Sequence, residues 1–161
     1  MNDTSIISDL LSYIEDNLTG DLSLDTLACE FNYSKFYLAR IFSEHTGCTL
    51  YKYIQGRRLT DAAQKLVETG QPIVEIAYEA HYNSQQAFTL AFHQMYALSP
   101  QTYRKNGVFL PRQPKIDMRR LVSRRSAAPL CGASYRGRSI TFRDASYRGH
   151  SIDCMGGKLA A

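Results

Sequence analysis

The stretch TLYKYIQGRRLTDAAQKLVETG, residues 49–70, predicts one long helix around which the rest of the chain is organised. Thr49 suits the N-cap and Gly70 the position after the helix, which leaves about 20 helical residues spanning roughly 30 Å. Gly56, inside the helix, should cost it about 1 kcal/mol relative to Ala. One broad apolar stripe predicts a buried face: Leu50, Ile54, Leu59, Ala62, Ala63, Leu66 and Val67.

The sequences on either side of this helix are copies of one pattern. Residues 28–42 read ACEFNYSKFYLARIF, and residues 77–92 read AYEAHYNSQQAFTLAF. Some positions recur after 50 residues and others after 49, with Asn83 as the inserted residue. The pairs are Ser34 and Ser84, Leu38 and Phe88, Phe42 and Phe92, Tyr53 and Tyr103, Ala28 and Ala77, Glu30 and Glu79, and Tyr33 and Tyr82. The chain therefore contains a duplicated unit.

Six further helices are predicted from caps, breakers and apolar spacing. They cover residues 4–18, 24–31, 35–46, 72–80, 85–96 and 99–105. Each copy of the repeat then has two short helices across a tight turn, the second beginning after a serine cap, which is the helix-turn-helix pattern. The fold class expected is all-α: seven helices, in two homeodomain-like three-helix units joined by the long central helix.

The net charge of +4 divides the chain into two regions of opposite sign. Residues 1–106 carry eight bases and twelve acids, a net charge of −4, whereas residues 107–161 carry eleven bases and three acids, a net charge of +8. We therefore predict a helical domain at 1–106 and a basic Arg/Ser/Gly-rich tail at 107–161. This tail contains prolines, few large apolar residues and the sequence ASYRG twice, at 133–137 and 145–149. Its composition favours a flexible or weakly hairpin-like tail; a small folded sensor is the alternative.

Several function classes are excluded by what the sequence lacks. No run approaches 18 apolar residues and the N-terminus is polar, so neither a membrane span nor a signal peptide is expected. No catalytic triad, phosphate loop or metal spacing occurs, and His81 and His93 are interpreted as surface residues; we predict no enzyme, cofactor or metal site. The cysteines are interpreted as reduced thiols of a cytosolic protein, with the first of them in the core: Cys29, Cys48, Cys131 and Cys154.

The second helix of each helix-turn-helix unit is the candidate DNA-reading element. In the first copy Lys35, Phe36, Ala39 and Arg40 should face outward near the helix start. Arg40 can bridge a guanine edge or hold a phosphate, Lys35 can hold a phosphate, and Phe36 can touch a thymine methyl. The alternatives are that the two cations are ordinary solvated charges and that the Phe36 ring packs in the core.

The second copy offers amides and a hydroxyl instead of cations. Its outward set is Gln85, Gln86 and Thr89, with His93 as a further candidate. Gln amides can pair with adenine, while a solvated polar face without any contact is the alternative. Reading helices must meet successive major-groove segments about 34 Å apart, and a connector of roughly 30 Å is of the right order. On that connector, Arg57 and Arg58 either contact phosphates or form salt bridges with Asp61.

These motifs resemble the DNA-binding domain of the AraC/XylS family of bacterial transcription regulators, and within it the MarA/SoxS/Rob subgroup. The resemblance covers residues 5–106. It rests on LSLDTLA, YSKFYLARIFSEHTG, YIQGRRLTDAAQKL, PIVEIA, NSQQAFTLAF and SPQTYR. It implies a monomer in the bacterial cytoplasm, associated with the nucleoid, that binds double-stranded DNA and contacts RNA polymerase as an activator.

At several positions this chain differs from the residues that are common in the subgroup it resembles. The contact positions of the first reading helix map to Phe36, Ala39 and Arg40, where the subgroup commonly has Trp and Gln at the first two. In the second helix Leu90 stands where an arginine is usual, and His81 stands in the turn where Gly is expected, so a positive φ is predicted at a non-Gly residue. The alternative function is a degenerate regulator that acts as a protein-interaction module, with polymerase or another regulator as partner and weak DNA binding.

Overall fold

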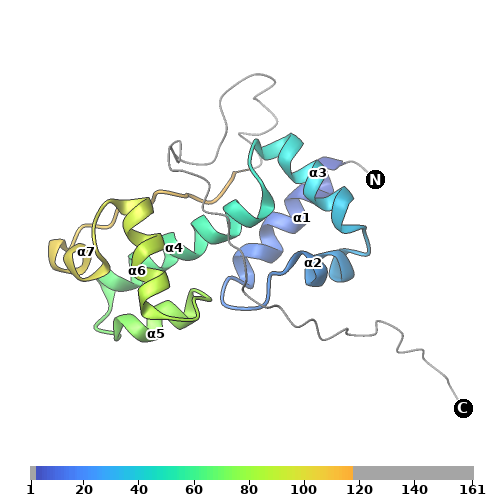
Figure 1. Ribbon diagram of the computed structural model, residues 1–161. Helices are drawn as coiled ribbons and strands as arrows, with labels where there is room; N and C mark the ends of the chain where they lie inside the picture. Colours follow the sequence, from blue (N-terminus) through green and yellow to red (C-terminus); the bar gives the residue numbers. More distant parts are fainter. Residues whose placement is uncertain (1–2, 118–161) are drawn as a thin grey trace, which may run out of the picture.

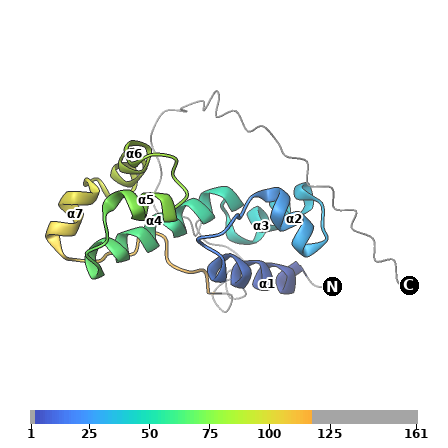
Figure 2. The ribbon, with the colours of Figure 1, turned by 90° about the horizontal axis from the view of Figure 1, so that it is seen from below.

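A computed structural model describes residues 3–117, in which the regular structure is helical and no strand occurs (Figure 1). The seven predicted helices and the all-α fold class are confirmed. In chain order the helices are α1 (Asp3–Asp16), α2 (Leu24–Phe31), α3 (Lys35–Thr46), α4 (Leu50–Glu68), α5 (Ile73–Glu79), α6 (Gln85–Tyr96) and α7 (Pro100–Asn106). The central helix α4 joins a unit containing α1–α3 at one end to a unit containing α5–α7 at the other (Figures 1 and 2).

Each unit has its own hydrophobic core, and α4 contributes to both. The first half of α4 supplies Tyr53 and Ile54 to a core with α1, α2 and α3. Its second half supplies Ala63 and Leu66 to a core with α5, α6 and α7. The aromatic rings of the second core are in direct contact; the centroids of Phe92 and Tyr96 are 4.5 Å apart in a stacked pair. Burial of these side chains from water is the main stabilisation of both units.

The duplication found in the sequence corresponds to equivalent positions in the two units. The paired serines cap α3 and α6, and the paired inner residues are buried at the same places: Leu38, Phe42 and Tyr53 are 0% exposed, and Phe88, Phe92 and Tyr103 are 0%, 0% and 3% exposed. Both helix-turn-helix units therefore use one packing scheme.

Hydroxyl caps fix the start of most helices. The side-chain oxygens of Ser23, Ser34, Thr49, Ser84 and Ser99 each accept a hydrogen bond from the backbone N–H three residues later, as the sequence predicts. The turn residue His81 has φ 62°, which confirms the positive φ expected there. Gly70 follows α4 without a positive φ, and the helix is capped by Thr69, whose N–H and hydroxyl both donate to the Lys65 carbonyl.

The prediction that Cys29 lies in the core is wrong. Cys29 is exposed, whereas Cys48 is buried. The eight-residue helix α2 places Leu27 in the core at 0% exposure, and Cys29 lies two residues further on, about 200° around the helix axis. Its position on the opposite face explains its exposure.

Residues 108–117 follow α7 without regular secondary structure and return along α4 towards α1 (Figures 1 and 2). Phe109 packs on the second core and Ile116 on the first. The first residues after the charge boundary at Gly107 are thus in contact with both helical units. The rest of the predicted basic tail, with the ASYRG repeat, Cys131 and Cys154, lies outside the described residues.

Candidate nucleic-acid interface

Helix α3 has one buried face and one exposed face. Leu38, Ile41 and Phe42 are each 0% exposed, which turns the residues between them outward. The side chains of Lys35, Phe36 and Arg40 are exposed and Ala39 is half-buried, so the predicted outward set lies on one side of the helix near its start.

The two cations of α3 are held by surface contacts. Lys35 forms an ion pair with Asp25. Arg40 Nη1 lies 3.2 Å from Glu44 Oε1, and the Arg40 guanidinium lies 5.6 Å from the centroid of the Tyr37 ring. The four paired side chains are between 50% and 73% exposed, and pairs this exposed contribute about 0–1 kcal/mol. Either cation can therefore exchange its partner for a phosphate or base oxygen at small cost.

Phe36 is the most exposed of the large apolar side chains between residues 3 and 117, at 88%. Its ring does not pack in the core, which excludes the alternative considered from the sequence. An exposed ring beside Lys35 and Arg40 is suited to an apolar contact such as a thymine methyl.

Helix α6 presents a different exposed surface. Gln85, Gln86, Leu90 and His93 are exposed and Thr89 is half-buried. These five residues line a shallow hollow on the surface of the helix. Phe88, Phe92 and Tyr96 hold the other face in the core. The predicted outward set is thus brought together, and Leu90, 58% exposed, lines the same hollow.

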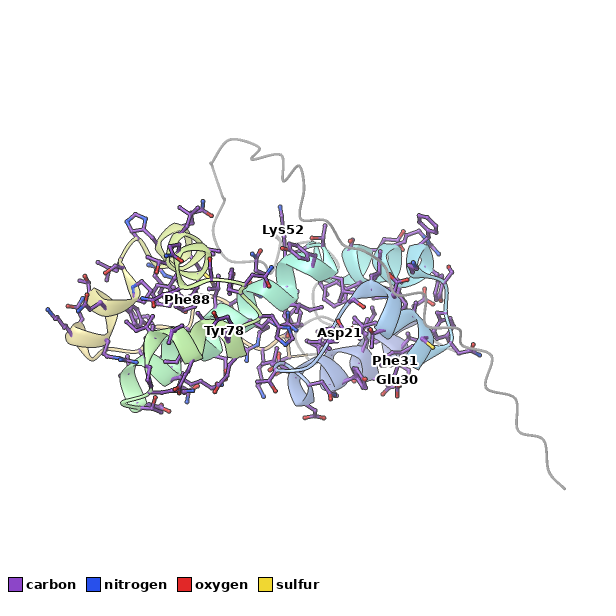
Figure 3. All side chains as sticks on the ribbon, turned by 60° about the horizontal axis from the view of Figure 1, so that its bottom comes forward. Asp21, Glu30, Phe31, Lys52, Tyr78 and Phe88 are labelled. Atoms are coloured by element: carbon purple, nitrogen blue, oxygen red, sulfur yellow. The ribbon has the colours of Figure 1, made fainter. Side chains whose placement is uncertain are left out.

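The two reading helices lie towards the same edge of the molecule. In Figure 3, α3 and α6 occupy the upper edge at either end, and Lys52, from the first turn of α4, projects from that edge between them. Asp21 and Glu30 lie lower in the same view. This edge is the candidate nucleic-acid interface. Lys52 belongs to it and is not among the residues predicted from the sequence, although the Thr49 cap marks it as a first-turn residue.

The two arginines of α4 have partners within the protein. Arg57 is 7% exposed; its Nε and Nη2 donate to the two Glu15 carboxylate oxygens at 2.7 and 2.9 Å. Arg58 is half-buried and donates to the backbone oxygens of Leu18 (2.8 Å) and Gly20 (2.6 Å). Neither pairs with Asp61, whose ion pair is with Lys65. Arg57 therefore has no access to a phosphate in this structure, and the prediction of a contact there has no geometric support.

The Glu15 carboxylate, 11% exposed, is the acceptor at the centre of a largely buried cluster that includes Arg57. Tyr53 Oη donates to Glu15 at 3.0 Å, and Lys115 Nζ lies 3.4 Å away. Burial alone would raise the pKa of Glu15, but the hydrogen bonds and the charge of Arg57 hold that pKa below its ordinary value. Burial raises the pKa of the Tyr53 hydroxyl, and the neighbouring Glu15 charge adds to this effect.

The two histidines considered as candidates from the sequence, His81 and His93, are both exposed. His81 is exposed, and its Nε2 lies 2.8 Å from the Thr19 backbone oxygen. Between residues 3 and 117 no group of three or more His, Cys, Asp or Glu side chains is placed to hold a metal ion. Within the same residues, no helix combines the length and apolar character needed to cross a membrane.

Two capped reading helices on one long connector define a tandem helix-turn-helix protein. Residues 27–106 match the family described as "Helix-turn-helix domain". The Tn10 TetD protein of Escherichia coli is 44% identical over 106 residues, which are 66% of this chain and 77% of TetD. MarA of E. coli K12 is 39% identical over 106 residues (66% of this chain, 84% of MarA). The "HTH-type transcriptional activator AarP" of Providencia stuartii is 41% identical over 101 residues (63% and 75%).

Two further comparisons show how much of a longer relative the chain spans and which solved structure shares its fold. The chain spans only 37% of the E. coli K12 right origin-binding protein, to which it is 42% identical over 106 residues, 66% of this chain. A Chromobacterium violaceum regulator with an AraC-type DNA-binding domain superposes with a TM-score of 0.59 at 26% identity, covering 63% of this chain and 91% of that one. The chain therefore belongs to the AraC family of DNA-binding transcription regulators, a family of proteins that are not enzymes.

Proposed function

We propose that this protein is a sequence-specific activator that inserts α3 and α6 into successive major-groove segments of double-stranded DNA. The observation that carries the proposal is the position of two capped reading helices towards one edge of the molecule, with their polar and aromatic side chains outward. One chain then supplies two reading elements, which ordinary repressors obtain by dimerising. A monomer is therefore sufficient for binding.

Helix α3 is the stronger anchor in this proposal. Arg40 is assigned a bidentate contact to guanine O6 and N7. Phe36 is assigned a contact to a thymine methyl, and Ala39 an apolar contact to the DNA. Lys35 and, on α4, Lys52 are assigned to phosphates, where their charge contributes affinity without sequence preference. Both cations are exposed, which supports these roles.

Helix α6 is the weaker reader. Gln85 and Gln86 are assigned to adenine N6 and N7, and Thr89 to a base edge or a methyl group. Leu90, exposed among them, adds an apolar contact that suits thymine. Since α6 contains no Lys or Arg, its half-site should be rich in A·T pairs and add little to the salt dependence.

Activation and contact with RNA polymerase are the further steps of the proposal. They are supported by the relative AarP, which is described as a transcriptional activator, and by the subgroup resemblance. A promoter-driven transcription assay with purified polymerase, with and without the protein, tests them directly.

The DNA-reading role is tested with the full chain and a random pool of duplexes. Selection should enrich two half-sites about one helical turn apart. Arg40→Ala should then weaken binding to the selected duplex by about 1–3 kcal/mol and relax the base preference at one position, as a gel-shift titration would measure. Lys105→Ala removes the same charge from an exposed position in the last turn of α7 and is the matched control.

Failure of that selection would favour the other candidate function. If the full chain enriches no sequence at low salt and yet binds RNA polymerase, the protein acts as an interaction module. The acidic charge of residues 1–106 and the exposed Leu90 in α6 are the observations that favour this second candidate.

A further inference from the structure

The segment after α7 is fastened to both helix-turn-helix units. At its start, Phe109 packs on the second core and the Leu110 N–H donates to Tyr103 Oη at 2.8 Å. At its end, Ile116 packs on the first core and its N–H lies 3.4 Å from Tyr53 Oη. The tyrosines that receive these bonds, Tyr53 and Tyr103, are the paired positions of the duplication. Residues 108–117 thus connect equivalent points of the two units.

The middle of the segment is held against α4 by buried polar contacts. Gln113 is 4% exposed; its N–H donates to Thr60 Oγ1 at 3.1 Å, and its carbonyl accepts from Arg57 Nη1 at 2.8 Å. Because Arg57 also holds both oxygens of Glu15 on α1, Gln113 is linked to the first unit through a buried ion pair. Buried hydrogen bonds to a charged group are costly to break, so this contact resists sliding of the segment along α4.

Gly56 provides the space for this contact. A Cβ atom at residue 56 would lie 3.0 Å from Gln113 Cγ and 3.1 Å from Gln113 Cβ. Both distances are closer than ordinary van der Waals contact, so a side chain there would push Gln113 outward. A glycine within a helix costs about 1 kcal/mol relative to alanine. The close approach of Gln113 is a structural reason for a glycine at this position.

From these contacts we infer that residues 108–117 are a brace that fixes the orientation of α3 relative to α6 and thereby selects the half-site spacing that the protein accepts. Gly56 and Gln113 are positioning residues in this scheme, and the spacing part of it rests on the proposed function. Direct bonds between the units, such as His81 to the Thr19 oxygen, are single polar contacts at an exposed site. The brace adds an apolar anchor on each unit and a buried polar contact between them.

The brace is tested first without DNA. Nitroxide labels at Ser12→Cys and Gln94→Cys, exposed positions on α1 and α6, report the distance between the units in a full chain whose four native cysteines are replaced by serine. The labelled protein should give one narrow distance distribution. Phe109→Ala combined with Ile116→Ala should broaden it, since both anchors are released. An unchanged distribution in that folded variant would overturn the brace.

Gly56→Ala is the second variant, because it leaves both apolar anchors in place. It should displace Gln113 and broaden the same distribution. Gly70→Ala is the matched control, since no atom lies within 4 Å of the added Cβ there. If Gly56→Ala keeps the narrow distribution of the control, Gln113 is not a positioning residue and the inference fails at that point.

The second readout is affinity for duplexes whose selected half-sites are moved apart by about one or two base pairs. The intact protein should prefer one spacing strongly. Release of the brace should lower affinity for that spacing by roughly tenfold, because the effective concentration of the second reader falls, and should leave binding to a single half-site unchanged. Equal spacing profiles for the intact and released proteins would refute the inference. Absence of DNA binding by the intact protein would refute the proposed function. The label distances would still show whether residues 108–117 fix the orientation of the two units.

Discussion

At the scale of the residue, Arg40 and Arg57 show how surroundings assign a role to one side-chain type. The Arg40 side chain is 59% exposed and pairs with a solvated glutamate, so its guanidinium remains available to a ligand. The Arg57 side chain is 9% exposed and its donors are used by Glu15 and the Gln113 carbonyl. The first arginine is suited to recognition and the second stabilises the fold.

Arg57→Met should therefore act on stability. The substitution leaves the Glu15 carboxylate buried without its main partner, and breaking a buried pair costs about 3–5 kcal/mol. Urea unfolding followed by circular dichroism should show that loss, whereas Arg40→Met should change the free energy of unfolding by less than about 1 kcal/mol. An Arg57→Met protein that kept its stability but lost DNA affinity would instead show that Arg57 contacts DNA.

At the scale of the element, α3 and α6 share an interior and differ in their surfaces. Both begin at a serine cap and bury equivalent side chains, as the duplication requires. Outward, α3 carries Lys35 and Arg40, while α6 carries uncharged residues and His93. The inner residues are constrained by packing, but the exposed residues are free to differ, so two copies of one unit can read DNA with unequal strength.

Leu90→Arg should reduce this inequality. Leu90 is 58% exposed, so the change should cost little stability and should place a cation in the hollow of α6. Affinity for the selected duplex should rise, and the salt slope should steepen by about 0.9 if one phosphate is neutralised. Ser12→Arg adds the same charge on the exposed side of α1 and should change neither quantity as much. Equal effects of the two substitutions would mean that α6 does not approach DNA.

At the scale of the whole molecule, two small cores are coupled through α4, the brace and the Glu15 cluster. Glu15 receives donors from Tyr53 and Arg57 of α4 and lies beside Lys115 of the brace. One buried carboxylate thus links α1, the connector and the C-terminal segment. The protonation state of that carboxylate should influence the stability of the assembly.

Acid should weaken this assembly in a defined range. The folded pKa of Glu15 is below its ordinary value of 4.5, so its contribution to stability is fully present above that value and is lost as pH falls through the folded pKa. Urea unfolding at a series of pH values should show a stability loss below 4.5 that is smaller in Glu15→Gln. The Gln variant should already be less stable at neutral pH, since it cannot pair with the Arg57 charge. Parallel losses in the two proteins would contradict this role for Glu15.

Helix ends were predictable because they depend on neighbouring residues. The caps at Ser34 and Ser84 form bonds three residues along the chain, whereas the positive φ of His81 was expected from the family resemblance, which places Gly at that turn position. Cys29 was misplaced because it lies in sequence among residues that pack on the first core, namely Leu24, Leu27, Ala28 and Phe31, while its own side chain is on the exposed face of this short helix. The burial of Arg57 could not be predicted for another reason: its partner Glu15 lies 42 residues away, and no local pattern indicates it.

The sequence by itself determined the seven helices, their caps, the duplication and the outward residues of α3 and α6. All of these follow from local hydrogen bonding and from the spacing of apolar side chains, which repeat within a few residues. Only the tertiary structure decided that Arg57 is buried and that residues 108–117 join the two units. These outcomes depend on contacts such as that of Arg57 with the Gln113 carbonyl, between residues 56 positions apart, which exist only once both cores have formed.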